Sequence, residues 1–317
     1  MTTVTILDDY QGVALSSADW SAVRDRAEIV SIADHIDDAD RLADRLASSE
    51  IIVAMRERTA FPASLLGRLP LLKLLVTTGM RNAAIDVPAA RAMGVTVCGT
   101  AGGGRAVPEL TLGMMIALTR HIAEEDAAVR AGRWQHTIGP QLGGRTLGVL
   151  GLGRIGIPVA RLAQAFDMSV IAWSPNLTAE RASEHGVLAV GKDELFDRAD
   201  IVTIHMPLSD RSTGLVGRDE LRLLGASGYL VNTSRGPIVD EQALIDALRG
   251  GEIAGAALDV YDVEPLPAGH PLRTAQNTLL LPHIGYVTTQ AYARFFADAA
   301  EDITAYLDGK PIRELTD

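Results

Sequence analysis

The sequence predicts an α/β protein of two domains, each built around a mainly parallel β-sheet. Short apolar segments alternate with longer amphipathic segments along nearly the whole chain, which is the pattern of repeated strand–helix–strand units. The length of 317 residues exceeds that of one average domain and suits two, and a hydrophobic content of 47% is sufficient for two cores.

The first strand–helix series occupies the N-terminal part of the chain. A run of glycines, Gly102-Gly103-Gly104, then provides a natural point to leave this domain. We therefore place the first domain at residues 1–102. Its expected strands are residues 4–7, 51–54, 71–76 and 95–97, and its expected helices include residues 41–48 and 87–93.

A largely buried helix is expected at residues 108–120, where apolar residues recur at helical spacing. The second series follows it, and a final helix at 288–307 is too long to be a tail, so we expect it to return to the first domain. The predicted division is 1–102 completed by 285–317, and 103–284. The second domain contains six expected strands, the number in a complete dinucleotide-binding domain, at residues 147–150, 170–173, 201–205, 229–232, 256–260 and 278–281.

The chain is acidic, with a formal net charge of −11. It has no clustered Lys and Arg for nucleic acid and no polybasic segment for an anionic membrane surface. No apolar run reaches the ~18 residues of a membrane span, and no signal peptide is evident at the start, so a cytoplasmic location is expected. The single cysteine, Cys98, and the scattered histidines show no metal-ligand spacing, so no metal is expected.

A glycine-rich turn lies near the start of the second series. Gly151, Gly153 and Gly156 match G-x-G-x-x-G between an apolar strand and an apolar helix. The glycines allow a tight turn, close approach of a pyrophosphate and close helix–strand packing, and the amides around Arg154 and Ile155 face the anion. The alternative is a glycine-rich turn without a ligand. The context favours a Rossmann-type, doubly wound domain that binds a nicotinamide dinucleotide.

The second strand of this domain ends at Ser174, where an acidic residue would hold the ribose hydroxyls of NAD. Without that carboxylate a 2′-phosphate is not repelled, which admits NADP. However, no Arg or Lys follows before Arg181, so no phosphate clamp is obvious. Ser174 and Asn176 offer hydrogen bonds to a ribose hydroxyl. We expect NAD as the cofactor, with NADP as the alternative.

Polar segments follow three later strands, where ligands bind in open parallel sheets. They contain Arg235, Glu264 and His283. Together with the glycine loop and residues 102–118 and 204–208, these segments resemble the D-isomer-specific 2-hydroxyacid dehydrogenases over nearly the whole chain. The resemblance implies a smaller, flavodoxin-like α/β substrate domain beside the Rossmann-type domain, with the active site in a cleft between them.

The resemblance further implies hydride transfer between NAD(P)H and C2 of a small 2-oxo or 2-hydroxy acid, with D stereochemistry. Arg235 would hold the substrate carboxylate and polarise the keto oxygen, because its guanidinium fork matches a carboxylate. His283 would donate a proton to that oxygen in reduction and accept it in oxidation. Glu264 would accept a hydrogen bond from the other ring nitrogen, fixing the tautomer and favouring imidazolium. Taken singly, each of the three residues would usually have only a surface or structural role.

Six further residues are expected to approach the cofactor: His205, Pro207, Thr233, Ser234, Asp259 and Gly285. In the resembling family the position of Asp259 contacts the nicotinamide amide; the alternative is a turn or cap. His205 and Pro207 stand in the loop beside the adenosine and nicotinamide, with a structural role at a strand end as an equal alternative.

Residues 77–86 stand at the family's substrate loop, where backbone amides after the first glycine hold the carboxylate. Gly79, Met80 and Arg81 are therefore the expected substrate-binding residues. Arg81 replaces the usual second glycine. Its side chain would either hold an acidic substrate as a second clamp or point to solvent, and the sequence favours neither alternative. Residues 98–105 and Tyr286 also depart from the family's pattern, so the identity of the substrate does not follow from the resemblance.

The implied activities are those of glyoxylate or hydroxypyruvate reductases and of phosphoglycerate dehydrogenases. Formate dehydrogenases of this type pair a Gln with the His, so Glu264 disfavours formate oxidation. The alternative from another class is a non-enzymatic, nicotinamide-sensing corepressor or scaffold of the same fold. The resemblance also implies a homodimer, and residues 108–134 are the expected contact surface.

Overall fold

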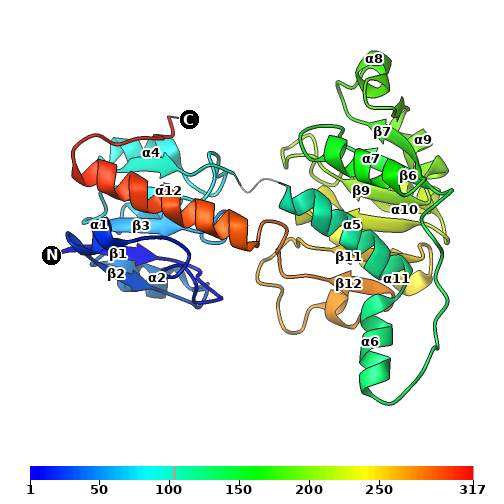
Figure 1. The fold of residues 1–317 in the computed structure, drawn as a ribbon, viewed down its shortest axis with the longest axis horizontal. Helices are drawn as coiled ribbons and strands as arrows, with labels where there is room; N and C mark the ends of the chain where they lie inside the picture. The colour runs from blue at the N-terminus through cyan, green and yellow to red at the C-terminus, as the bar shows by residue number, and fades with distance from the viewer. Residues whose placement is uncertain (103–104, 317) are drawn as a thin grey trace. The chain divides into compact units, whose positions relative to one another are not determined.

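The computed structural model describes residues 1–102 and 105–316 and contains two compact units (Figure 1). Unit 1 comprises residues 1–104 and 287–317, and unit 2 comprises residues 105–286. The corresponding boundaries in the sequence prediction are 102 and 284. Gly103 and Gly104, from the predicted glycine break, lie outside the described residues.

Unit 1 is built on a parallel five-stranded sheet in the order β2-β1-β3-β4-β5, which is the flavodoxin-like order. Its central strands are buried on both faces, so they appear in the sequence as continuous apolar runs. The strands are β1 (Thr2–Ile6), β2 (Ala27–Ser31), β3 (Ile51–Ala54), β4 (Leu74–Thr77) and β5 (Thr96–Gly99), and the helices are α1 (Ser21–Arg24), α2 (Ala39–Leu46), α3 (Ala63–Leu66), α4 (Val87–Ala92) and α12 (Thr289–Leu307).

Two strands of unit 1 differ from the sequence prediction. The prediction omits β2, because this edge strand alternates a buried Ala27 with an exposed Glu28 and lacks an apolar run. Strand β4 begins at Leu74 and not at residue 71, because Leu71 is 49% exposed and precedes the strand.

The C-terminal helix α12 packs on β4 and α1 within unit 1. Aromatic rings join it to the unit: the ring of Phe296 lies 6.2 Å from that of Trp20 and 5.7 Å from that of Tyr292, between centroids. Alternate strand residues, such as Ile52 and Leu75, form a separate core with α2, α3 and α4. The sheet therefore carries helices on both faces, as a buried parallel sheet requires.

Unit 2 is built on a parallel seven-stranded sheet in the order β12-β11-β10-β9-β6-β7-β8. The sequence prediction of six strands is wrong by one: it omits β8, an edge strand of only two residues that shows no periodicity. The strands are β6 (Thr146–Leu150), β7 (Ser169–Trp173), β8 (Leu188–Ala189), β9 (Ile201–Ile204), β10 (Tyr229–Asn232), β11 (Gly255–Leu258) and β12 (Thr278–Leu280).

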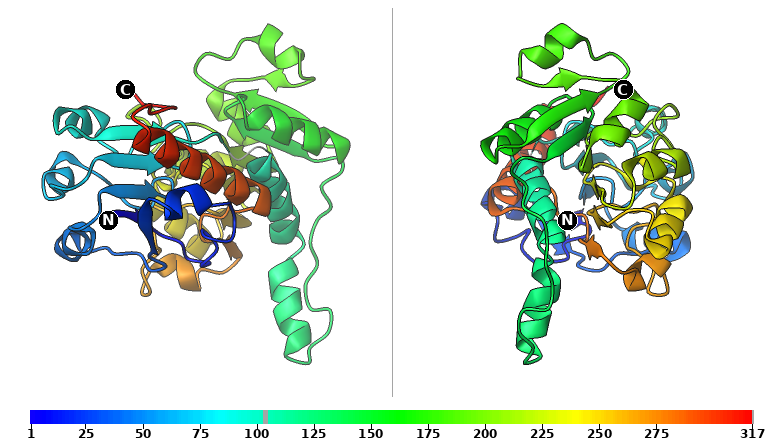
Figure 2. Two further views of the ribbon diagram at one scale, coloured as in Figure 1. Left: turned by 60° about the vertical axis from the view of Figure 1, so that its left-hand side comes forward. Right: turned by 90° about the vertical axis from the view of Figure 1, so that its right-hand side faces the viewer.

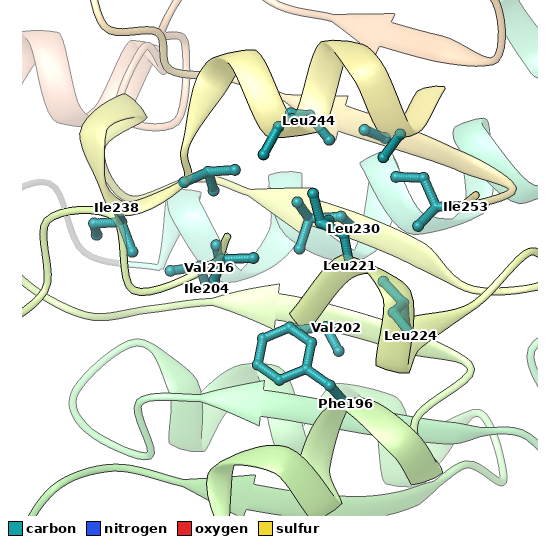
Figure 3. Close-up of a cluster of buried hydrophobic side chains, with 14 of the residues drawn as sticks. Phe196, Val202, Ile204, Val216, Leu221, Leu224, Leu230, Ile238, Leu244 and Ile253 are labelled. Atoms are coloured by element: carbon teal, nitrogen blue, oxygen red, sulfur yellow. The ribbon is translucent and has the colours of Figure 1, made fainter. Parts of the chain in front are cut away.

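Helices cover both faces of this sheet, as expected for a doubly wound fold. On one face α9, α10 and α11 enclose a core that contains Phe196, Val202 and Leu230 (Figure 3). On the other face α5 and α7 pack over residues such as Ile201 and Val231. The helices of unit 2 are α5 (Ala106–Thr119), α6 (Ile122–Arg130), α7 (Gly156–Ala165), α8 (Ala179–Ser183), α9 (Lys192–Arg198), α10 (Arg218–Leu224) and α11 (Glu241–Gly250), with short 3₁₀ turns η1 (Gly236–Ile238) and η2 (Pro271–Thr274).

Strand β6 has β7 on one side and β9 on the other, so the chain leaves the middle of the sheet in two directions. Loops after β6 and β9 diverge at such a switch point, and ligands of open α/β sheets bind there. Helix α6 projects away from the rest of unit 2 in both views of Figure 2. Among the described residues, no helix is both long enough and apolar enough to cross a bilayer.

Candidate functional site

The glycine-rich turn follows β6 directly at the switch point. Gly151 has a φ of 105°, and a Cβ there would lie 2.6 Å from the carbonyl oxygen of His205. A Cβ on Gly156 would lie 2.1 Å from the carbonyl oxygen of Gly151. Packing explains these two glycines, but a Cβ on Gly153 would meet no described atom within 4 Å. The space over Gly153 therefore fits a group outside the protein, as a pyrophosphate site requires.

A cavity of about 330 Å³ lies beside this turn. Its lining includes Gly151, Gly153, Ser174, His205 and Pro207, so these predicted cofactor-binding residues gather at one place. No side chain caps the N-terminus of α7, and no acidic residue lies in its first turn. The free end of the helix dipole favours an anion. Cavity, glycine turn and helix end together fit the adenosine and pyrophosphate of a dinucleotide.

His205 lines this cavity as a neutral residue. Its Nε2 lies 3.0 Å from Oγ1 of Thr203, and its Nδ1 is buried without a hydrogen-bond partner among the described residues. Burial lowers the pKa of His205 to about 3, because the ring loses hydration that the imidazolium needs. His205 therefore brings no positive charge toward a phosphate.

The three predicted catalytic residues follow neighbouring strands at the carboxyl edge of the sheet. Arg235 follows β10, Glu264 follows β11 and His283 follows β12. The strand ends are level, because the register pairs Asn232 with Leu258 and Leu258 with Leu280. Parallel strands of this kind bring residues distant in the sequence to one edge.

A glycine holds two of these loops in contact. A Cβ on Gly236 would lie 2.1 Å from the carbonyl carbon of Tyr261 and 2.5 Å from the amide nitrogen of Asp262. Any larger residue at this position would push the Arg235 loop away from the loop that carries Glu264. Gly236, which the sequence analysis did not name, therefore sets the spacing of the candidate site.

Glu264 and His283 form a direct pair. Nδ1 of His283 lies 2.6 Å from Oε2 of Glu264, and the other carboxylate oxygen accepts a hydrogen bond of 2.9 Å from the amide of Tyr261. Because an ionised carboxylate only accepts, Nδ1 carries the hydrogen and Nε2 is the nitrogen left for a substrate. The imidazole is 20% exposed, so a small molecule has access to it.

Asp259 fixes the backbone just after His283. Its two carboxylate oxygens accept hydrogen bonds from the amides of Ile284 and Gly285, at 2.7 and 2.8 Å. Burial raises the pKa of Asp259 to about 6, since the carboxylate is almost fully removed from water. His283 itself has a left-handed φ of 52°, which is uncommon outside glycine. These bonds give Asp259 a positioning role for this loop, and its predicted contact with the nicotinamide amide stays a prediction.

Internal hydrogen bonds also hold the Arg235 loop. The side chain of Asn232 accepts from the amide of Ser234 and donates to the carbonyl of Arg235, both at 2.9 Å. The hydroxyl of Ser234 donates to the carbonyl of Ile204, and the hydroxyls of Thr233 and Thr111 are 3.1 Å apart. The side chains of Thr233 and Ser234, predicted to approach the cofactor, thus tie the loop to β9 and α5.

In unit 1 the predicted substrate loop follows β4. The amide of Gly79 donates to Oγ1 of Thr100, while Met80 and Arg81 are exposed. Nη1 of Arg56 donates to the carbonyl of Thr78, and a Cβ on Gly79 would lie 2.1 Å from that nitrogen. Arg56, which the sequence analysis did not name, therefore bonds to the predicted substrate loop, and its Nε lies 3.7 Å from Oε2 of Glu57.

Known proteins resemble this chain in sequence and in structure. Residues 112–285 match the model of the D-isomer specific 2-hydroxyacid dehydrogenase, NAD binding domain. The chain is 38% identical over 259 residues to a glyoxylate reductase of Thermofilum pendens, with 78% of this chain and 76% of that protein covered. It is 35% identical over 264 residues to a D-3-phosphoglycerate dehydrogenase of Archaeoglobus fulgidus, with 82% of this chain covered but only 50% of the relative.

A solved structure gives the same result. The crystal structure of a phosphoglycerate oxidoreductase from Vibrio cholerae superposes with a TM-score of 0.92 at 34% identity, covering 98% of this chain and 100% of the other. The chain thus belongs to the D-isomer specific 2-hydroxyacid dehydrogenase family and is a nicotinamide-dependent oxidoreductase with the fold of that family.

Proposed function

We propose that this protein interconverts a small 2-oxo acid and the corresponding D-2-hydroxy acid, with a nicotinamide dinucleotide held by residues 151–156. The observation that carries the proposal is the Glu264–His283 pair, which leaves Nε2 of a partly exposed imidazole free for proton transfer. Both kinds of relative described above, the glyoxylate reductases and the phosphoglycerate dehydrogenases, are named for 2-oxo or 2-hydroxy acids.

Reduction of a 2-oxo acid adds a hydride to C2 and a proton to the keto oxygen. When bound, the nicotinamide supplies the hydride. His283 supplies the proton from Nε2, and Glu264 offsets the positive charge of the imidazolium before that proton leaves. The guanidinium of Arg235 holds the substrate carboxylate and polarises the keto oxygen. The substrate-binding roles of Gly79, Met80 and Arg81 stay predictions.

Both NAD and NADP are compatible with the end of β7. Ser174 and Asn176 line the cavity beside the glycine turn and offer hydrogen bonds to a ribose hydroxyl. Neither brings a carboxylate that would exclude a 2′-phosphate. The nicotinamide cofactor itself agrees with the family model, which describes an NAD-binding domain.

We expect the wild-type enzyme to oxidise NADH or NADPH in the presence of at least one acid from a panel of glyoxylate, hydroxypyruvate, 3-phosphohydroxypyruvate and phenylpyruvate. Absorbance at the reduced-nicotinamide band measures the rate, and chiral analysis of the product tests the D configuration. Binding of a dinucleotide without turnover of any of these acids would reject the proposal and favour a nicotinamide-sensing scaffold.

We further propose a homodimer whose contact surface is the segment 122–138, which includes α6 and extends four residues beyond the predicted surface at 108–134. Four large apolar side chains of this segment are strongly exposed: Ile122 (49%), Val129 (51%), Trp134 (76%) and Ile138 (99%). Large apolar side chains that are exposed to water within one short segment are typical of an interface. A second copy of the same surface would cover them in a closed, two-fold arrangement.

The double substitution Trp134→Glu and Ile138→Asp is expected to convert the dimer into a monomer, because each protomer would have to bury two charges in the interface. Light scattering after size-exclusion chromatography measures the mass. Leu71→Asp is the matched control, since Leu71 is a 49% exposed apolar residue of unit 1 and lies outside the segment. A wild-type protein of monomer mass, or a double variant that stays dimeric, would contradict the assignment.

A further inference from the structure

We propose that the cavity beside the glycine turn selects NADP(H) over NAD(H), with Arg181 and Arg211 holding the 2′-phosphate of the adenosine ribose. This inference rests on the proposed dinucleotide site and assigns its specificity. It departs from the sequence-based expectation of NAD.

The charges that line the cavity have one sign. Arg181 and Arg211 are both part of the lining, and among the described residues no carboxylate lines it. The acidic residues next to them in the chain, Glu180 and Asp210, do not line the cavity. An anionic group that enters this space therefore meets two guanidiniums and no carboxylate, and the arginine fork suits phosphate oxygens.

Ser174 stands at the end of β7, where the ribose of an adenosine lies in this fold. An acidic residue at this point accepts hydrogen bonds from both ribose hydroxyls of NAD and repels a 2′-phosphate. A serine hydroxyl instead donates to a phosphate oxygen, and it adds no negative charge. Ser174 and the two arginines line the same cavity, so the change at Ser174 and the positive charge act on the same ligand group.

Local structure explains how the two arginines reach the cavity. Arg181 lies in the short helix α8, whose first turn is capped by the Thr178 hydroxyl, which accepts from the amide of Arg181 at 3.3 Å. Arg211 lies in the turn after β9, where the hydroxyl of Ser212 donates to the carbonyl of Pro207 and accepts from the amide of Ser209, both at 2.8 Å. The backbone that carries each arginine is therefore fixed.

Both guanidiniums are available to a ligand. Arg181 and Arg211 are exposed, and neither forms an ion pair with a carboxylate of the described chain. Binding a phosphate therefore does not require an existing ion pair to break. Sequence spacing hides this arrangement, because Arg181 is separated from Ser174 by a loop and Arg211 follows a different strand.

Calorimetry with 2′,5′-ADP and 5′-AMP tests the inference, because the two nucleotides differ in the 2′-phosphate. We expect the wild-type protein to bind 2′,5′-ADP at least about 10-fold more tightly, as charge-assisted hydrogen bonds predict. Arg181→Ala and Arg211→Ala are each expected to weaken 2′,5′-ADP about 10-fold and to leave 5′-AMP within about 2-fold. The ratio of kcat/KM for NADPH to that for NADH is expected to fall in parallel.

Ser174→Asp tests the same site in the opposite direction. Its carboxylate is expected to reverse the preference toward 5′-AMP and NADH. Arg161→Ala, which removes an exposed arginine of α7 outside the cavity, is the control for a loss of net charge and is expected to keep the wild-type preference. Equal or tighter binding of 5′-AMP by the wild-type protein, or an unchanged preference in both arginine variants, overturns the inference but keeps the dinucleotide site. Failure of both nucleotides and both dinucleotides to bind overturns the proposed function as well.

Discussion

His283→Ala is expected to slow the turnover of a 2-oxo acid by at least about 100-fold, the lower limit for loss of a positioned general acid. The imidazole is the group whose Nε2 remains available after Nδ1 has bonded to Glu264 at 2.6 Å. Without it, water must protonate the keto oxygen as the hydride arrives. Steady-state rates at saturating oxo acid and dinucleotide measure the loss.

The dinucleotide affinity of this variant is expected to stay within a few-fold of wild type, because His283 does not line the cavity beside the glycine turn. Trp173 lines that cavity, so quenching of its fluorescence reports on binding independently of turnover. Retained affinity with lost turnover separates a missing proton donor from a misfolded protein.

A second histidine–glutamate pair in the same unit provides a matched control. Nε2 of His270 lies 3.0 Å from Glu241, and both side chains are about as buried as the His283 pair. His270→Ala is expected to keep the turnover rate within a few-fold of wild type, because His270 and Glu241 are not among the residues of the candidate site. Full activity in His283→Ala, or an equal loss in both variants, would refute the assigned proton donor.

The parts of the fold that were predictable from sequence are those with a strong local signal. The glycine turn, the apolar strand before it and the helix after it need only neighbouring residues to specify them. Strands β2 and β8 were missed because both lie at sheet edges, where one side of the strand makes no sheet contact and the apolar pattern is weak or too short.

The contrast between local and long-range signals holds at the candidate site too. The sequence predicts Arg235, Glu264 and His283 as a group because each follows a strand, and parallel strands bring such residues to one edge. Their catalytic roles stay predictions. Sequence could not show whether a polar side chain turns inward. Hydrogen bonds connect the hydroxyls of Thr233 and Ser234 and the carboxylate of Asp259 to other segments of the chain. Which segments these are depends on the tertiary structure alone.

Residues that act across two strands were the hardest to predict. Arg56 lies against Gly79 because β3 pairs with β4, and Arg181 and Arg211 line one cavity although they follow β7 and β9. Strands β3 and β4 are neighbours in their sheet, and β7 and β9 flank β6 in theirs. Strand order, which the sequence does not state, decides which of these side chains come together.

Replacement of Arg235 is expected to have the second large effect, and this effect is mainly a loss of kcat/KM for the oxo acid. Nη1 of Arg235 already donates to the carbonyl of Ser234 at 2.7 Å, which orients the guanidinium before a carboxylate arrives. Arg235→Ala is expected to lower kcat/KM for the oxo acid by about 100-fold or more, since hydrogen bonds to a charged group are lost together with the charge. Arg235→Lys keeps the charge but not the fork and is expected to lose about 10-fold or more.

The comparison between these two variants distinguishes a bidentate clamp from simple charge. Dinucleotide affinity is expected to stay near wild type in both, and added guanidinium ion is expected to restore part of the activity of Arg235→Ala but not of Arg235→Lys, where the ammonium occupies the space. Arg249→Lys, at the exposed end of α11, controls for the exchange itself. If Arg235→Lys keeps both kcat and KM, the carboxylate needs only a positive charge at this strand end, and the bidentate role proposed for Arg235 is refuted.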